Sequence, residues 1–331
     1  MVNDVATPAT VRAAPVVRRR RVGRRPAAGG SPAKNLLYSR KAAPYVFVLP
    51  FILTFGIFWA FPLGRSFLMS TQHILPGVTE NVGLDNFERL VGDRLFWLAM
   101  GNSLRYTLLT LVLLIPIPLV LAVWVNSRIG SPKIKAFFKS AMFVPALTSV
   151  VVAGIVFRLM FSESETALFN QVIGAFGLEP EKWLKNDLTG LLALLLVAMW
   201  RWTGVNMMYF LAGLQSIPAE YYEAAELDGA SRWQTFRYVT LPQMRPTIIY
   251  VLTISVYGGM AMFLESFMLY GGNNSPQNIG LTIVGYLYRQ GIEKNDLGYA
   301  SAVGVVLLLV ILAINITQLA FNGMFRKGAT R

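Results

Sequence analysis

The chain has 331 residues, of which 54% are hydrophobic and only 14% are charged. This balance excludes an ordinary soluble domain and predicts a membrane protein. The absence of cysteine excludes disulfides and thiolate chemistry, and the single histidine, His73, excludes a histidine-rich metal site. We therefore expect no metal site in the chain.

The first 44 residues form a basic tail. They hold ten Lys or Arg residues, including the run from Arg18 to Arg21, within a stretch rich in Ala, Pro and Gly. Such a composition lacks the apolar side chains that a folded segment needs, so we expect disorder. A basic tail directly before a membrane span is typical of a topology signal that also binds anionic lipid. The net charge of +13 is therefore interpreted as a membrane feature, and no nucleic-acid partner is expected.

Six apolar stretches are each long enough to cross a bilayer, which takes about 20 residues. They lie at Tyr45–Phe67, Ser103–Val125, Ala136–Phe161, Leu188–Leu214, Thr247–Tyr270 and Ala300–Phe321. The predicted fold class is therefore all-α, a polytopic membrane protein with six transmembrane helices. Residues 1–44 are taken as the cytoplasmic tail and residues 45–331 as the transmembrane domain.

The distribution of Lys and Arg predicts the orientation. With the N-terminus inside, the cytoplasmic segments hold 20 of these residues and the outer loops hold six. Positive charge is concentrated on the cytoplasmic side of membrane proteins, so we expect both termini in the cytoplasm. The same count places the polar loop 215–246, between the fourth and fifth spans, in the cytoplasm.

This loop carries a series of helix signals. Pro218 suits the first position of a helix, where a missing N–H costs nothing. Glu223 then lies near the positive end of the helix dipole. Gly229 can adopt a positive φ and end the helix, and Ser231 can cap a second one. The loop is predicted to be a helix, a glycine break and a second helix.

The same loop reads Glu-Ala-Ala-x3-Gly-x9-Val-x-Leu-Pro from residue 223 to residue 242. This pattern resembles the EAA loop of permease subunits of bacterial binding-protein-dependent ABC importers. In that family the first helix of the loop docks in a cleft of the cytoplasmic ATPase. The resemblance implies that the ATPase-coupling residues here are Glu223, Ala224, Ala225, Asp228, Gly229, Leu241 and Pro242.

Further stretches resemble the carbohydrate branch of these permeases, which includes maltose and glycerol-phosphate importers. They are Val82–Phe87, Phe210–Pro218 and Gly298–Ala302, and the resemblance covers roughly residues 45 to 326. Many members carry Thr-x-Gly-Gly-Pro after the fifth span, whereas this chain has Tyr270-Gly-Gly-Asn-Asn-Ser-Pro276. The departure puts in doubt whether this outer loop makes the contacts that it makes in other members.

The resemblance implies a set of partners in a bacterial cytoplasmic membrane. They are a second permease, for which we favour a different chain, two ATPase subunits, an extracytoplasmic solute-binding protein and a sugar or polyol substrate. The chain has no Gly-x4-Gly-Lys-Ser/Thr motif, so ATP and Mg are expected in the partner ATPases and no cofactor in this chain. No catalytic residue is expected, and the chain is interpreted as a transport subunit rather than an enzyme.

Spans four and five hold candidate residues for the substrate path, because aromatic faces and hydrogen-bonding groups suit a sugar. In the resembled family the substrate sits between spans equivalent to these two. Positions 200, 203, 204 and 207 share one helical face, which we expect to point at the permease interface, with Gly204 admitting a sugar ring or a partner helix. Aromatics that face lipid or other helices remain an alternative. The candidates are Trp200, Thr203, Gly204, Asn206, Met207, Tyr257, Phe263 and Glu265.

A different class of function is also open at this stage. Charged residues within membrane spans usually mark a pathway or an ion pair, and the spans contain Arg158, Arg201 and Glu265. Of these, Arg158 and Glu265 are close enough in depth to pair. Such charges would also suit a self-sufficient secondary transporter driven by an ion gradient, in which the EAA loop would have no role.

Overall fold

The computed structural model describes residues 42–75, 77–127 and 130–322. The predicted basic tail lies almost entirely outside the described residues. The chain divides into two compact units, Met1–Phe61 and Pro62–Arg331. In the first unit, helix α2 (Ala43–Phe55) continues into a π-helical turn, η1 (Gly56–Ala60), and neither contains a buried residue. A helix that is apolar on every side and buries nothing in its own chain requires lipid or a partner around it.

The described residues contain four candidate spans, or six as predicted if each of two bent helix pairs is one broken span. Among the described residues, four continuous stretches are long and apolar enough to cross a membrane. The first, Ala43–Met69, ends with α3 (Phe61–Met69), and the second, Arg94–Asn126, joins α5 (Arg94–Leu114) and α6 (Pro116–Asn126). The other two are α10 (Asp187–Gln215) and α17 (Leu297–Phe321). The third and fifth spans are bent pairs. They are α7 (Pro132–Leu147) with α8 (Val150–Met160), bent by 98°, and α14 (Arg245–Met260) with α15 (Leu264–Tyr270), bent by 42°.

The second span begins earlier than predicted. The sequence placed its start at Ser103, whereas the helix begins at Arg94. The side chain of Asp93 accepts hydrogen bonds from the backbone N–H groups of Leu95 (2.8 Å) and Phe96 (3.4 Å) and so caps the helix. Hydropathy alone missed this start because the first two turns lie outside the most apolar window.

The two bends lie at short extended or irregular breaks. Thr148 and Ser149 both have extended backbone torsions after Pro145, and they separate α7 from α8. The second halves of the two broken spans then pack together, with Gly154 of α8 directly against the side chain of Met268 of α15. A side chain at Gly154 would overlap Met268, so this close approach depends on glycine.

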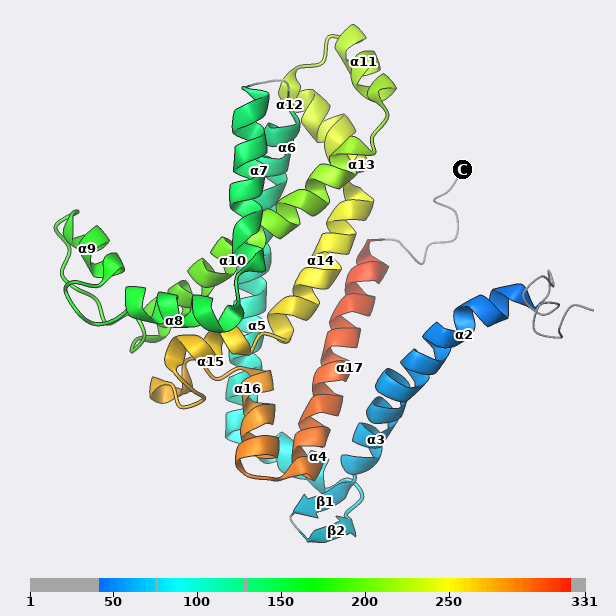
Figure 1. Ribbon diagram of the computed structural model, residues 1–331, viewed down its shortest axis with the longest axis vertical. Helices are drawn as coiled ribbons and strands as arrows, with labels where there is room; N and C mark the ends of the chain where they lie inside the picture. Colours follow the sequence, from blue (N-terminus) through cyan, green and yellow to red (C-terminus); the bar gives the residue numbers. More distant parts are fainter. Residues whose placement is uncertain (1–41, 76, 128–129, 323–331) are drawn as a thin grey trace, which may run out of the picture. The chain divides into compact units, whose positions relative to one another are not determined.

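Short elements connect the spans. They are an antiparallel hairpin of β1 (Gln72–Leu75) and β2 (Val78–Asn81), and the helices α4 (Asp85–Gly92), α9 (Leu168–Gly174), α16 (Ile283–Tyr288) and η4 (Arg289–Glu293), with one 3-10 turn, η3 (Pro276–Asn278). The hairpin is a small departure from the all-α prediction. In Figure 1 it lies at the opposite end of the second unit from α11 (Ala219–Leu227) and α12 (Arg232–Thr235).

Helix α10 is shared by two of the three buried clusters. One cluster lies between α5, α8, α10 and α15, and another lies between α6, α10 and α14. The third joins α4, α5, α16 and α17. Figure 1 shows α10 crossing α6 and α7 obliquely. Because α10 packs in two clusters, only the part of its surface that neither cluster covers is left to contact a ligand.

A buried polar network fixes the end of the molecule near α4. The carboxylate of Asp93 accepts hydrogen bonds from the hydroxyls of Tyr286 and Tyr299, and Arg89 forms an ion pair with Asp296 at 2.6 Å. Burial raises the pKa of Asp93, but the hydrogen bonds from Tyr286, Leu95 and Tyr299 together outweigh it and hold that pKa below its ordinary value. The network therefore ties α5 to α16 and α17 with a charged carboxylate.

Candidate functional site

The segment predicted to couple to an ATPase forms as the sequence indicates. Helix α11 begins after Pro218, which is the N-cap rather than the first helical residue. It ends at Gly229, whose φ is +73°. The N–H groups of Gly229 and Ala230 donate to the carbonyls of Glu226 (3.1 Å) and Ala225 (2.9 Å), which is the Schellman arrangement for a helix end. The predicted role of Gly229 in ending the helix is confirmed.

The second helix of the segment is capped as predicted. The hydroxyl of Ser231 accepts from the backbone N–H of Gln234 at 3.3 Å, and the Gln234 side chain accepts from the N–H of Ser231 at 2.8 Å. This reciprocal capping box starts α12, which continues through the π-helical turn η2 (Phe236–Thr240) into α13 (Leu241–Gln243). Leu241 and Pro242 therefore lie on a nearly continuous helix that leads to α14.

The predicted coupling residues divide between two faces. Glu223, Ala224 and Asp228 are exposed, and Gly229 is exposed at the turn. Ala225, also among the predicted coupling residues, is instead buried against the rest of its own chain. The hydroxyl of Thr240 in η2 donates to that of Tyr222 in α11 at 3.4 Å. The segment is thus a helix with one face held by the second helix and one face open.

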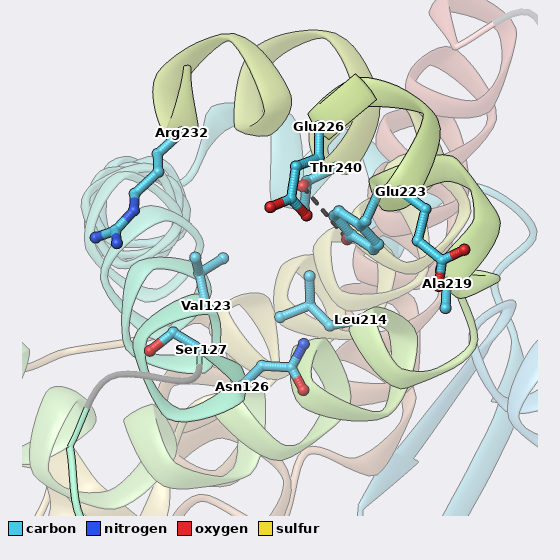
Figure 2. A pocket seen from close by; sticks show the side chains of 10 residues that line it. Val123, Asn126, Ser127, Leu214, Ala219, Glu223, Glu226, Arg232 and Thr240 are labelled. Carbon is cyan, nitrogen blue, oxygen red and sulfur yellow. Dashed lines mark hydrogen bonds between the residues drawn. The ribbon is translucent and has the colours of Figure 1, made fainter. Parts of the chain in front are cut away.

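A cavity of about 490 Å³ lies beneath α11. It is enclosed by the ends of α6 and α10 together with α11, α12 and η2, and its lining residues are Val123, Asn126, Ser127, Leu214, Ala219, Tyr222, Glu223, Glu226, Arg232 and Thr240. Figure 2 shows the carboxylate of Glu226 pointing toward the side on which Arg232 lies, whereas that of Glu223 points away. Both side chains line the cavity, and Glu226 is the one whose carboxylate is directed toward the Arg232 side.

A second cavity, of about 360 Å³, lies within the membrane-spanning part. Its lining comes from α5, from α10 and from the broken span of α14 and α15, which are far apart in sequence. The residues are Tyr106, Thr110 and Leu114 of α5, Trp202, Val205, Asn206 and Tyr209 of α10, and Ile254, Ser255, Tyr257, Gly258, Gly259, Ala261, Met262 and Glu265 around the bend between α14 and α15. Three of the predicted path residues, Asn206, Tyr257 and Glu265, are thus brought together.

Three of the four positions on the α10 face predicted to be open are covered by this chain itself. Trp200 packs edge-on against Phe157 of α8, and Thr203 and Met207 are buried. A Cβ at Gly204 would lie 2.9 Å from the backbone N of Phe143 in α7 and still closer to the carbonyl oxygen of Met142. Gly204 therefore serves the close packing of α10 on α7, and Trp200, which is 38% exposed, is the one of the four positions that stays open.

The open face of α10 is carried by Trp202, Asn206 and Tyr209, spaced i, i+4 and i+7. The predicted path residues did not include Trp202, Tyr209 or the α5 residues, although the polar Asn206 was a signal for this face. Phe263 does not line the cavity and instead packs on Phe267 and Tyr288, each with ring centroids 5.2 Å away.

Asn206 also has a structural role. Its side-chain amide donates to the carbonyl oxygen of Leu114 at 2.9 Å. In a regular helix that carbonyl would accept from the residue four positions later, which is Pro118 and has no N–H. Asn206 therefore satisfies the orphaned carbonyl where α5 meets α6, as neighbouring helices do for proline breaks in membranes.

The charges within the spans do not form the pair that was left open. Among the described residues Glu265 makes no ion pair or hydrogen bond, and the guanidinium of Arg158 lies against Gly271 instead. Arg201 lies 5.4 Å from the ring centroid of Trp202. In the part of the chain that the structure describes, no group of three or more His, Cys, Asp or Glu could hold a metal ion.

Comparison with known proteins identifies the family. Residues 106–328 match the family described as "Binding-protein-dependent transport system inner membrane component". The chain belongs to this family. It is a multi-pass permease subunit of an ABC importer, as the EAA pattern indicated, and the alternative of a secondary transporter is set aside.

The similarity to relatives and solved structures covers most of the permease. This chain is 50% identical to the arabinooligosaccharides transport system permease protein AraP of Bacillus subtilis, over 88% of this chain and 92% of the relative. It is 30% identical to the lactose transport system permease protein LacF of Rhizobium radiobacter, over 83% and 92%. A chain of a bacterial ABC transporter involved in the import of the acidic polysaccharide alginate matches with a TM-score of 0.74 and 26% identity, over 87% of this permease and 97% of that chain.

Proposed function

We propose that this permease imports short arabinose-containing oligosaccharides and that α11 couples it to a cytoplasmic ATPase. One observation carries the substrate class, namely the 50% identity to a permease named for arabinooligosaccharides over 88% of the chain. A second protein of that name, from Halalkalibacterium halodurans, is 49% identical. Relatives named for lactose and for trehalose/maltose are much more distant, at 30% and 26% identity.

The proposed assembly contains a second permease, two ATPases that bind ATP and Mg, and an extracytoplasmic binding protein. Binding-protein dependence is a property of the family to which the chain belongs. A structure related to this permease was solved with a pentasaccharide-bound periplasmic protein. The cavity between α5, α10 and α14 is open on one side of the chain and would form half of a path completed by the second permease.

The described contacts provide a mechanical route from the proposed coupling helix to this cavity. Motion of α11 reaches η2 because the two elements are in contact and because Tyr222 and Thr240 are hydrogen-bonded. The helix of η2 and α13 leads directly to α14, which lines the cavity. Docking of an ATPase on the open face of α11 would in this way alter the bend at which the cavity lies.

Uptake by a deletion strain tests the substrate. We expect complementation by this permease to restore uptake of labelled arabinotriose and not of lactose or maltose. Restored uptake of lactose or maltose without arabinotriose would contradict the proposed substrate.

A charge reversal tests the coupling. Glu223→Arg combined with Gly229→Pro should leave the permease in the membrane but separate ATP hydrolysis from uptake, because it alters the exposed face and the end of α11. Glu80→Arg, on the exposed strand β2, is the matched control and should transport normally. Normal uptake by the double variant would exclude α11 as the coupling element.

The orientation has a direct test because the native chain contains no cysteine. Leu227→Cys places a thiol on a side chain that is 90% exposed in α11, and Phe176→Cys places one on a side chain that is 80% exposed after α9. With both termini in the cytoplasm, an impermeant maleimide added to intact spheroplasts labels only Phe176→Cys. Labelling of Leu227→Cys alone would reverse the proposed topology.

A further inference from the structure

Glu265 is a carboxylate without a counter-charge. It lies in the first turn of α15, directly after the bend from α14, and lines the membrane cavity. Among the described residues it makes no ion pair within 4 Å and no hydrogen bond. An unpaired carboxylate within a membrane is costly, which makes a functional reason for it the first hypothesis to test.

The rest of the cavity does not neutralise this charge. Its lining contains no Lys, Arg or His, and its polar groups are hydroxyls and the amide of Asn206, whose N–H is occupied by Leu114. The charged residue next to Trp202 in sequence, Arg201, lies over the Trp202 ring and is not part of the lining. The cavity therefore combines aromatic surfaces with a single fixed negative charge.

We propose that Glu265 is a specificity-determining residue that makes this cavity accept neutral sugars and reject anionic ones such as uronic acids. This rests on the proposed function, in which the cavity is part of the sugar path. A carboxylate accepts hydrogen bonds from sugar hydroxyls, and the rings of Tyr106, Trp202 and Tyr257 offer apolar surface to a sugar face. A second carboxylate brought into the same low-dielectric space is repelled by it.

The comparison with a solved relative sharpens this assignment. That importer is involved in taking up an acidic polysaccharide, and one of its chains shares the fold of this permease. A path for a polyanion and a path for a neutral sugar must differ in the charge that they present. In this permease Glu265 is the one charged residue among the described residues that line the cavity, so it sets the sign of that charge.

The charge can be measured without any assumption about the sugar. Ser255 lines the cavity, and Ser255→Cys gives the assembled importer, in nanodiscs with cysteine-free partners, one reactive thiol. This thiol is labelled with methanethiosulfonates that carry a trimethylammonium group, a sulfonate group or no charge. Each labelling rate is divided by the rate of the same reagent with a free thiol in solution. We expect the cationic reagent to be favoured over the anionic one by about tenfold. Adding Glu265→Gln should bring this ratio close to that of the free thiol.

Glu163→Gln is the matched control. Glu163 forms an ion pair with Lys185 at 2.7 Å and is not part of the cavity lining, so its replacement should leave the ratio unchanged. A ratio equal to that of the free thiol in the Ser255→Cys importer would overturn the proposal, as would a ratio that Glu265→Gln does not change. Failure of all three reagents to label would also overturn it, because a closed cavity cannot select solutes.

Protection by sugars separates this proposal from the proposed function. Arabinotriose should slow the labelling of Ser255→Cys, and a uronate-bearing trisaccharide of the same length should do so about tenfold less well. Glu265→Gln should reduce that difference. A charge preference of the reagents without protection by any sugar would refute the cavity as the sugar path. Equal protection by both sugars would refute the selectivity.

Discussion

The α11 segment (residues 215–246) and the membrane cavity are two regions that form through different kinds of contact. In the segment, each feature is made by residues close in sequence, such as the Ser231–Gln234 box and the turn at Gly229. In the cavity, side chains from α5, α10 and α14–α15 meet only because the helices pack. The comparison shows that local sequence signals determine where the helices of the segment begin and end. The cavity instead depends on which face of each helix is buried.

This difference predicts different responses to substitution. Changes at the Ser231 cap and at the Gly229 turn should stay local, because the bonds there link residues a few positions apart. Changes at the helix contacts behind the cavity should affect the whole membrane part, since α10 belongs to two buried clusters.

The largest effect is expected at Gly204. Gly204→Leu drives a side chain into the α7 backbone at Met142 and Phe143 and should cost about 3 kcal/mol or more, at the upper end for overpacking. Folded yield and thermal unfolding in detergent measure this. Gly101→Leu is the control, because a Cβ there meets no atom within 4 Å. A Gly204→Leu permease as stable as the Gly101→Leu one would refute the α7–α10 contact.

An intermediate effect is expected at Asn206. Asn206→Leu leaves the Leu114 carbonyl without a donor and should cost about 1–3 kcal/mol in thermal stability. Pro118→Ala restores a backbone N–H that can reach the same carbonyl, so Asn206→Leu should cost about half as much or less in that background. Equal costs in the two backgrounds would mean that Asn206 does not compensate for Pro118.

A smaller and local effect is expected at Gly229. Gly229→Ala places a Cβ in a residue whose φ is +73° and should cost about 1 kcal/mol in the stability of α11. Asn tolerates this conformation, so Gly229→Asn should cost less. Hydrogen exchange of the α11 amides reports the difference, and the α10 amides should not change. Faster exchange throughout α10 would show that the segment is not local.

The smallest effect is expected at Ser231. Ser231→Ala removes the acceptor of the Gln234 N–H and should cost about 0.5–1 kcal/mol, again confined to the start of α12. Ser231→Asp keeps an acceptor and should retain the protection of that amide. If the Gln234 amide exchanges at the same rate in the Ser231→Ala and Ser231→Asp variants, the capping box does not stabilise the second helix.

Six spans, the helix-break-helix form of residues 215–246 and the ABC-importer family could all be predicted from the sequence. Span length is a direct reading of apolar runs. Caps and turns depend on residues within a few positions of one another, so Pro218, Gly229 and Ser231 were informative by themselves. The buried position of Ala225 could not be predicted, because it depends on how α11 packs against the rest of the chain.

The tertiary structure alone decided the bends of spans three and five and the face of α10 that opens to the cavity. The physical reason is the solvent. In water, an apolar stripe marks the buried face of a helix, but in lipid both faces are apolar and the pattern does not separate them. Gly204 is equally consistent in sequence with a sugar contact and with close packing. Only the position of α7 assigns it to packing and leaves Trp202, Asn206 and Tyr209 to face the cavity with Glu265.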